Sequence, residues 1–303
     1  MSPGSGEGAT AGAGAGSGAG PGGLVNDYDG PCAVCGAVVA AGSGVLRHGR
    51  TGGWEVYHPE HVREPTPPAR LGHPGWHRRR LMALDIATTG NRAAVDRILA
   101  ASVRTSDDVS ADWILDPGSD PLSLAPGKGH GITIERARRE GVPAADALGE
   151  VADLLVEHLA SGELLVVWFA PHVLTTLHAE LLRHGVRPLT ERLPAGVAPV
   201  CDPLVLDRHA DRYRPGRRSL DAVTAWYGIP HAHPGEAASD AEATLALAQV
   251  IGASYPSIAR LSRPALHAEQ ILWNADLSRH RPGTPDWPMT PVEPLPWEDP
   301  KAG

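Results

Sequence analysis

A lone carboxylate stands in the apolar stretch LMALDIATTG, residues 81–90. Asp85 lies within that run, and a Thr-Thr-Gly turn follows it. A carboxylate in an apolar strand is costly unless it is paired or binds a cation, so its position indicates chemistry. Two residues further on, where a second carboxylate would share its face of the strand, the chain has Ala87. The stretch therefore predicts a strand that presents half of a carboxylate pair.

Residues that can bind a metal ion precede this strand. Cys32 and Cys35 are followed by His58 and His61 in the pattern Cys-x2-Cys-x22-His-x2-His, with His48 as a spare ligand. Zn²⁺ takes four sulfur and nitrogen ligands, and the pattern predicts structural zinc. The common two-Cys two-His finger has a shorter central gap and a longer His spacing. Two reduced cysteines beside incidental histidines, or a redox pair, are the alternatives. A module of about 35 residues has too small a hydrophobic core to fold without a stabilising element such as a bound zinc ion.

The composition excludes several classes of protein. The chain has 303 residues, enough for one sizeable domain and a small one. Its net charge of −8 argues against a generally basic nucleic-acid binder, so phosphate contacts must use local patches. Three cysteines are too few for a disulfide framework, and Cys201 is predicted to be a packed core thiol. We find no membrane-spanning run or signal-peptide pattern and expect a cytoplasmic protein without membrane contact.

The chain divides into six segments by composition. A tail rich in Gly and Ala comes first, and it is predicted to be disordered because it cannot bury a core. The boundaries are 1–26 for this tail, 27–63 for the zinc-binding module, 64–75 for a linker, 76–255 for the main domain, 256–280 for a helical extension and 281–303 for a Pro-rich tail. The extension is predicted to pack back on the main domain through Leu266, Ile271 and Leu277, and docking of a protein partner is the alternative.

The main domain alternates between strand-like and helix-like stretches. Three strand-like runs come first, separated by short turns. Helical and strand patterns then alternate, which predicts an α/β fold with a mixed sheet flanked by helices. The expected strands are 80–88, 97–105, 111–118, 163–171 and 198–206, and the expected helices are 143–162, 174–185, 219–228 and 236–252. Asp202 and Asp207, on the last strand, are expected to be turn or surface acids.

Five stretches in this order resemble the DEDD-class 3′–5′ exonucleases, especially the epsilon proofreading subunit of bacterial DNA polymerase III and its free-standing relatives. ALDIATTG resembles the first motif, Asp-x-Glu-Thr-Thr-Gly. VVWFAPHVLTTLHAELLRHG resembles the second, Asn-Ala-x-Phe-Asp before a helix, and GEAASDAEATLAL the third, His-x-Ala-x-x-Asp. HGIT (130–133) and residues 201–230 resemble the segments before the first long helix and before the third motif. The resemblance covers residues 76–255 and implies a ribonuclease-H-like fold.

The resemblance implies Asp85 and Asp240 as catalytic carboxylates, but the chain departs from the pattern elsewhere. Ala87 stands at the Glu position, Val173 at the second Asp position and Gly235 at the His position. Hydrolysis with two metal ions needs several hard oxygen ligands, and a general base contributes about 10²–10⁴ in rate. We therefore expect weak or absent binding of Mg²⁺ or Mn²⁺ at the two remaining acids. The interpretation is an exonuclease-family protein with an incomplete catalytic set that binds nucleic acid but has lost efficient phosphodiester hydrolysis.

Two other functions remain open. The first is an active metal-dependent exonuclease that borrows ligands from His172, His231, His233 or Glu236, with His233 as the base. The second is a zinc-dependent scaffold for protein interaction, in which the small module and the C-terminal helix bind partners. Salt-dependent binding of nucleic acid separates the scaffold from the other two.

A basic segment supplies the expected contacts with nucleic acid, which the resemblance implies are single-stranded 3′ ends. Arginines grouped around an aromatic ring can hold phosphates and stack a base. A solvated face whose arginines pair with surface acids is the alternative. The candidates are Arg208, Arg212, Tyr213, Arg214, Arg217 and Arg218.

Overall fold

The structure is a computed structural model that describes residues 24–48, 53–62, 67–119, 122, 124, 129, 131–212, 214 and 216–290. It divides into two compact units, residues 1–66 and 67–303, which are treated separately below. Tyr213 and most of the two predicted tails lie outside the described residues. Within the described ranges, no helix is both long and apolar enough to span a bilayer.

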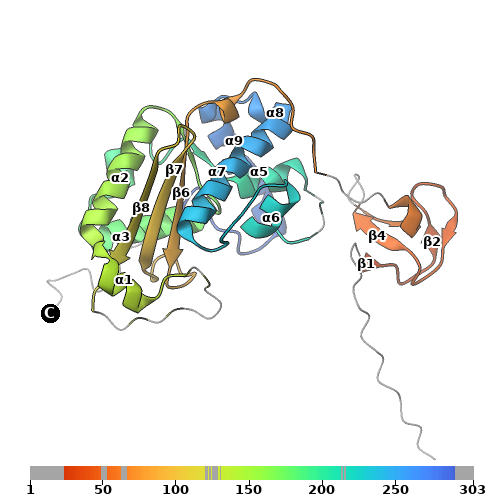
Figure 1. Ribbon diagram of the computed structural model, residues 1–303. Helices are drawn as coiled ribbons and strands as arrows, with labels where there is room; N and C mark the ends of the chain where they lie inside the picture. Colours follow the sequence, from red (N-terminus) through yellow and green to blue (C-terminus); the bar gives the residue numbers. More distant parts are fainter. Residues whose placement is uncertain are drawn as a thin grey trace, which may run out of the picture. The chain divides into compact units, whose positions relative to one another are not determined.

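The first unit consists of short strands and turns (Figure 1). Its strands form a three-stranded sheet in the order β1-β4-β5 and a two-stranded sheet of β2 and β3. The bounds are β1 Leu24–Val25, β2 Gly30–Pro31, β3 Val38–Val39, β4 Val45–His48, β5 Trp54–Tyr57 and the 3-10 turn η1 Pro59–His61. The unit starts earlier than the predicted boundary at residue 27, because β1 pairs with β4 and buried Asn26 accepts a 2.7 Å hydrogen bond from Gly44 N.

The second unit is built on a six-stranded mixed sheet in the order β11-β10-β6-β7-β8-β9 (Figure 1). The central strand β6 runs antiparallel to β7 and parallel to β10. The bounds are β6 Leu81–Thr88, β7 Ile98–Thr105, β8 Ser110–Asp116, β9 Val142–Pro143, β10 Leu164–Val166 and β11 Val200–Cys201. A mixed sheet flanked by helices is the predicted fold class, and the structure confirms it.

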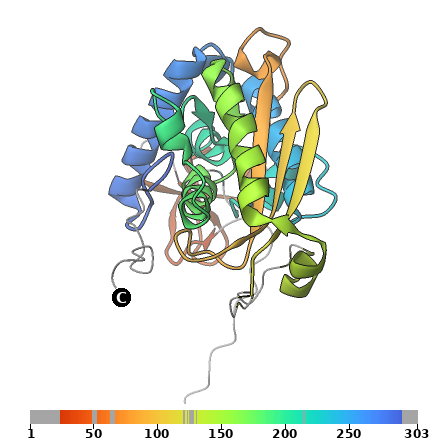
Figure 2. The same ribbon diagram turned by 90° about the vertical axis from the view of Figure 1, so that its left-hand side faces the viewer.

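Helices cover both faces of this sheet (Figures 1 and 2). The described helices are η2 Trp76–Arg78, α1 Ile134–Glu140, α2 Ala144–Ala160, α3 Ala170–Arg183, α4 Leu189–Arg192, α5 Pro203–Ala210, α6 Leu220–Trp226, α7 Ala237–Ser254, α8 Pro256–Ala259 and α9 Arg263–His280. Alternate residues of β6 enter different cores. Met82 and Leu84 pack with α2 and α3, whereas Leu81 and Ala83 pack with α7. The two-residue period of a strand therefore places Asp85 on the face that α7 covers.

The strand predicted over 198–206 is much shorter, because Asp202 and Pro203 begin helix α5. Asp202 is the N-cap, and its Oδ1 accepts a 3.0 Å hydrogen bond from Leu204 N. The expectation that Asp202 and Asp207 are turn or surface acids is wrong, since both side chains are buried. Cys201 is a buried core thiol, as predicted.

Both ends of the main domain extend into segments predicted to be linker or tail. Leu71 N donates a 2.7 Å hydrogen bond to Ala253 O, so residues 67–75 pack on the domain. Trp287, in the segment 281–290, is buried in the core beside α3.

Helix α9 packs on the domain through Leu266, as predicted, but the rest of its buried face differs from the prediction. Leu266, Gln270 and Asn274, spaced four residues apart, are its buried side chains, whereas Ile271 is 42% exposed.

Candidate functional site

A cluster of four metal-binding side chains lies in the first unit. Cys32, Cys35, His58 and His61 each offer one ligand atom, and these atoms all lie within 4.8 Å of one another. Cys32 Sγ is 3.4 Å from His61 Nδ1, and Cys35 Sγ is 3.5 Å from His58 Nδ1. In a tetrahedral zinc site, neighbouring ligand atoms are about 3.3–3.8 Å apart. The predicted residues therefore come together with a geometry that could hold zinc.

Two tight turns position these ligands. Gly36 N donates to Cys32 O at 2.8 Å, which closes the Cys-x-x-Cys turn, and Gly36 adopts a φ of 74°. His61 N donates to His58 O at 2.9 Å, which turns both imidazoles toward the same side. Desolvation opposes ionisation of Cys32, but the hydrogen bond with His61 and nearby backbone N–H groups lower the pKa of its thiol to about 5. A thiolate at neutral pH is the form that binds Zn²⁺.

A cleft of about 480 Å³ opens in the second unit beside the end of β6. Its lining combines carboxylates, arginines, aromatic rings and apolar residues. The lining residues are Asp85, Ile86, Ala87, Thr88, Asn91, Gly129, Trp168, Phe169, His172, Val173, Leu204, Arg208, Arg218, Gly235 and Asp240. All five motif positions named from the sequence therefore meet in one cleft, although they lie on β6, on α3 and at the start of α7.

The two acids of the cleft differ in their surroundings. Asp85 is 9% exposed, on β6. Asp240 lies in the first turn of α7, and its Oδ1 accepts hydrogen bonds from His231 Nε2 at 2.6 Å and from Gly235 N at 2.9 Å. One oxygen of Asp240 is thus already engaged by the loop that leads into α7.

The path of that loop suits a glycine at residue 235, the position where the third motif has His. Gly235 adopts a φ of 95°, a backbone conformation that side chains with a Cβ rarely accept. A histidine at this position would require a different path of the loop, and the 2.9 Å bond from Gly235 N to Asp240 would change with it.

The other two vacated positions are apolar. Ala87 packs with Leu99, Ile132 and Ala237, and Val173 is 4% exposed. In the part of the chain that the structure describes, the Cys/His cluster is the one group of three or more possible metal ligands. The cleft therefore does not fit a two-metal set of carboxylates.

The residues proposed as substitutes do not form such a set either. The His231 side chain is 6% exposed and is hydrogen-bonded to the Asp240 carboxylate. His233 is exposed, and its backbone N donates to Ser239 Oγ at 3.0 Å. Glu236 lies beside Gly131.

The arginines of the predicted basic segment have three different surroundings. Arg208 and Arg218 line the cleft, and Arg218 also pairs with Asp207. Arg214 is buried, donates to both oxygens of Asp207 at 2.7 and 2.8 Å, and lies 4.9 Å over the Trp226 ring. Its guanidinium is therefore part of the domain's interior. Desolvation lowers the pKa of Arg208, whose Nε is buried without a hydrogen-bond partner.

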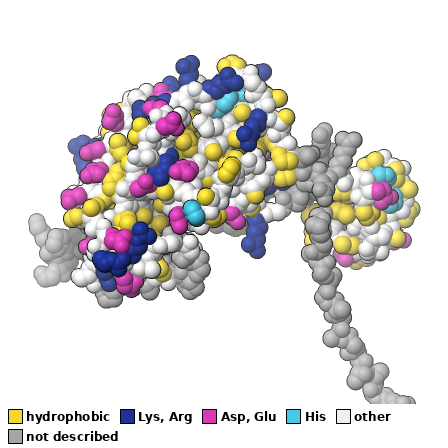
Figure 3. Space-filling view, viewed as in Figure 1, with side chains coloured by type: hydrophobic (Ala, Val, Ile, Leu, Met, Phe, Trp, Pro, Cys, Tyr) yellow, Lys and Arg dark blue, Asp and Glu magenta, His cyan; other side chains and the backbone are white. Residues whose placement is uncertain are grey.

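Arg212 and Arg217 lie elsewhere. Arg217 is exposed, whereas Arg212 lines a second cleft of about 410 Å³ between α5 and α9 and pairs with Asp276 at 3.3 Å. Arg208 lines both clefts. A further basic group lies over α1 (Figure 3), where Arg136 and Arg139 pair with Glu140. Positive charge is thus distributed over several places, as the negative net charge leads one to expect.

One wall of the cleft is aromatic. Trp168, Phe169 and His172 line it, and the rings of Phe169 and His172 are stacked at 6.2 Å with an interplanar angle of 15°. Nothing in the composition of the segment indicates this wall. The spacing of the second motif does contain a signal, since Phe169 occupies the place of its Asn.

A buried carboxylate holds this wall. Asp202 accepts hydrogen bonds from Phe169 N at 3.2 Å, from Ala170 N at 2.9 Å and from Trp287 Nε1 at 3.4 Å. Burial raises the pKa of Asp202 to about 6, although the backbone N–H groups favour its ionised form. The start of α3, the start of α5 and the C-terminal segment are therefore tied to one carboxyl group.

We expect the stability of this domain to depend on pH through Asp202. Because the pKa in the folded state (about 6) exceeds the ordinary value of 3.8, its contribution is fully present below about pH 4 and is lost as the pH rises through 6. The free energy of unfolding should rise by about 1.4 kcal/mol per unit through this group as the pH falls from 6 to 4. Urea unfolding of wild type and Asp202→Asn across this range gives the difference; parallel curves would contradict the assignment.

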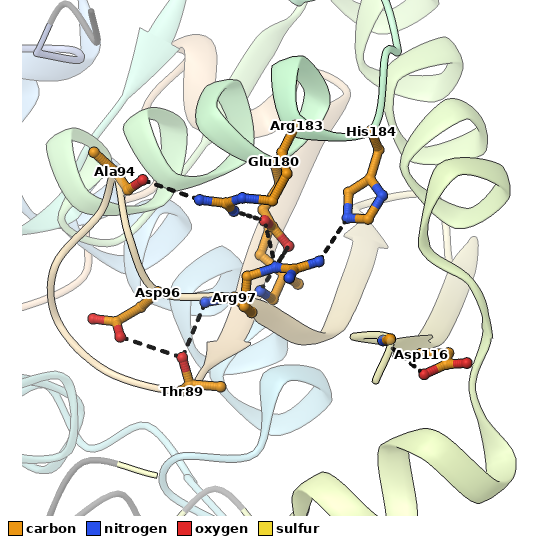
Figure 4. A network of polar contacts seen from close by, with 10 residues as sticks. Thr89, Ala94, Asp96, Arg97, Asp116, Glu180, Arg183 and His184 are labelled. Carbon is orange, nitrogen blue, oxygen red and sulfur yellow. Dashed lines mark hydrogen bonds and ion pairs between the residues drawn. The ribbon is translucent and has the colours of Figure 1, made fainter. Parts of the chain in front are cut away.

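A buried ion network lies between α3 and the segment that precedes β7 (Figure 4). Glu180 of α3 accepts hydrogen bonds from Arg97 Nε at 3.0 Å and from Ile98 N at 3.1 Å, and it also pairs with Arg183. Arg97 Nη2 donates to His184 Nε2 at 2.9 Å, and burial lowers the pKa of His184, which keeps it a neutral acceptor. The network joins α3 to the segment between β6 and β7.

Comparison with known proteins identifies the fold. No protein-family model matches the sequence, and no curated protein is significantly similar to it. A solved structure of exonuclease I is similar, with a TM-score of 0.52 and 19% identity over 59% of this chain and 42% of that chain. Exonuclease I of E. coli with a dA16 oligonucleotide has a TM-score of 0.51, 19% identity and the same coverages. The zinc-bound E. coli exonuclease I–ssDNA complex has a TM-score of 0.52 and 19% identity over 58% and 41%. The chain spans about two fifths of these proteins, and the likeness establishes a shared fold.

Proposed function

We propose that the domain at residues 67–290 binds single-stranded 3′ ends of nucleic acid in its cleft and hydrolyses them slowly or not at all. The observation that carries the proposal is the content of this cleft. The five motif positions meet there, and three of them hold Ala87, Val173 and Gly235 in place of a carboxylate, a carboxylate and a base.

The cleft retains what binding requires. Arg208 and Arg218 supply positive charge, and Trp168, Phe169 and His172 supply flat rings. Positive charge that follows a backbone, together with aromatic side chains that stack bases, is the usual combination for single strands. The similar structures of E. coli exonuclease I with oligonucleotides support the same choice of ligand.

The cleft lacks what efficient hydrolysis requires. In two-metal hydrolysis, the ions activate the attacking water and stabilise the leaving oxygen. Asp85 and Asp240 alone would hold an ion weakly, and one oxygen of Asp240 already accepts two hydrogen bonds. His231 donates through Nε2 to this carboxylate, so it positions Asp240.

Binding is tested first, because wild type alone suffices. Fluorescence anisotropy with a 5′-labelled oligothymidylate should show an affinity that falls as salt rises. Arg208→Gln should weaken binding and lower the slope of log K against log salt by about one. Arg136→Gln is the matched control, since Arg136 does not line the cleft. Absence of binding by wild type would overturn the proposal and favour a protein-interaction scaffold.

Hydrolysis is tested on the same oligonucleotide in Mg²⁺ and in Mn²⁺. Wild type should leave the strand intact, and the double variant Ala87→Glu, Val173→Asp should gain metal-dependent shortening. Degradation by wild type at rates typical of enzymes, abolished in Asp85→Ala, would contradict the proposal and establish an active exonuclease with borrowed ligands.

The first unit offers one observation that favours an additional role in protein interaction. Several of its large apolar side chains are exposed although the unit is small. These are Leu24, Val25, Tyr28, Val34, Val38 and Trp54, each at least 55% exposed. Exposed apolar side chains in this number are typical of interaction sites, and a protein partner for this unit stays a proposal.

A further inference from the structure

The one phenylalanine of the chain adopts an unfavourable backbone conformation. Phe169 has φ 54° and ψ 57°, in the left-handed region, and it is the N-cap of α3. Gly, Asn and Asp accept this region far more readily than a bulky residue, because Cβ approaches the following carbonyl oxygen. Asn is the residue that the second-motif pattern places here. A phenylalanine at this position therefore needs both a cause that holds it and a use that offsets the strain.

The cause is the buried carboxylate of Asp202. Its two oxygens accept hydrogen bonds from Phe169 N at 3.2 Å and from Ala170 N at 2.9 Å. Asp202 is itself fixed, since its backbone N donates to Gln270 Oε1 at 2.7 Å and its side chain caps α5. The left-handed turn is thus imposed from the interior of the domain.

Burial of the ring does not explain the phenylalanine. The side chain is 39% exposed and belongs to none of the three apolar cores, so it is not an interior residue of the domain. The ring lies instead on the wall of the cleft and is stacked on His172. An exposed, rigidly held, flat ring beside Arg208 and Arg218 suits a ligand that is itself flat and is joined to phosphate.

We propose that Phe169 is a nucleobase-stacking residue and that Asp202 is its positioning residue. Phe169 and His172 form a platform on which one base near the 3′ end rests, while the arginines face its phosphates. This inference rests on the proposed function and adds how the ligand is held. The cleft would bind the strand through a stacked base and would not need metal ions at Asp85 and Asp240 to hold it.

The test replaces the ring by the residue that suits the backbone. Phe169→Asn should unfold at the same or a higher temperature than wild type, because Asn accepts the left-handed region. Its affinity for an octathymidylate should fall by about 5- to 100-fold, the value of one stacked base. Phe169→Tyr should retain the affinity. Val109→Asn, which removes an exposed apolar side chain outside the cleft, should leave it unchanged.

Abasic oligonucleotides separate stacking from shape. Each of the four 3′-terminal positions is made abasic in turn, and binding is measured with wild type and Phe169→Asn. Removal of the base at one of these positions should markedly weaken binding by wild type and leave the affinity of Phe169→Asn unchanged. This is the coupling expected of two stacked partners. Equal sensitivity of both proteins at every position, or an unchanged affinity of Phe169→Asn, would overturn the inference while wild-type binding still supports the proposed function. Failure of wild type to bind any oligonucleotide would overturn both.

Discussion

Replacement of Cys32 by serine is expected to remove zinc from the chain and unfold the first unit, with the second unit still folded. Cys32 is the buried member of the Cys/His cluster, and it joins the Cys-x-x-Cys turn to β5 through a bridge to Val56. Structural zinc contributes about 10–16 kcal/mol of binding free energy in small modules, which becomes folding free energy. The core of this unit is too small to offset such a loss, since Asn26, Cys32, Val39 and Gly44 are its buried described residues.

The measurement combines metal analysis with hydrogen exchange. Wild type should carry one zinc per chain, and residues 24–48 and 53–62 should exchange slowly until a chelator is added. Cys32→Ser should carry no zinc and exchange rapidly there. Cys201→Ser is the matched control, because Cys201 is a buried thiol of the second unit and no ligand. Slow exchange of the first unit in Cys32→Ser would show that zinc does not hold it together.

Replacement of Glu180 by alanine is expected to lower the free energy of unfolding of the second unit by about 3–5 kcal/mol. The side chain of Glu180 is 1% exposed and faces Arg97 and Arg183, which are 8% and 12% exposed. Removal of the carboxylate leaves two guanidinium groups without their buried counter-charge and leaves Ile98 N without its acceptor. The loss should reach the cleft, because the network ties α3 to the segment that follows β6 (Figure 4).

Urea unfolding gives the free energy directly, and oligonucleotide binding reports on the cleft. Glu140→Ala is the control, since Glu140 is an exposed partner of Arg136 and Arg139 and should change stability by at most about 1 kcal/mol. A loss of less than about 1 kcal/mol in Glu180→Ala would mean that the buried pairs contribute little here.

The candidate sites were predictable where the chemistry depends on local spacing. Cys32 and Cys35 lie in one turn, and His58 and His61 lie in another. Their residue types and short spacings were therefore enough to predict a group of four possible metal ligands. Asp85 and Asp240 were found in the same way, because each stands at a fixed place in a short pattern. The structure adds that they line one cleft together with Ala87, Val173 and Gly235.

The segments joined to the main domain were harder to predict. Residues 67–75 and 281–290 are rich in proline and read as linker and tail, yet Leu71 and Trp287 fasten them to the domain. A Pro-rich composition reports the absence of regular structure, and it carries no information on whether an irregular segment finds a surface to pack on. The buried face of α9 was also mispredicted. Polar Gln270 and Asn274 are buried there, whereas apolar Ile271, which was expected to be buried, is exposed.

By itself the sequence determined the mixed α/β class, the Cys/His cluster and which residues stand at the motif positions, because these depend on residue type and short spacing. Only the tertiary structure decided which charges are available. Arg208 reaches the cleft whereas Arg214 is buried against Asp207, and Glu180 meets Arg97 83 residues away. It also decided that Asp202 is interior and that Phe169 is held in a left-handed turn. Burial and pairing depend on neighbours that only the folded chain brings together, and at this cleft they set the charge, the strain and the exposed ring on which binding would depend.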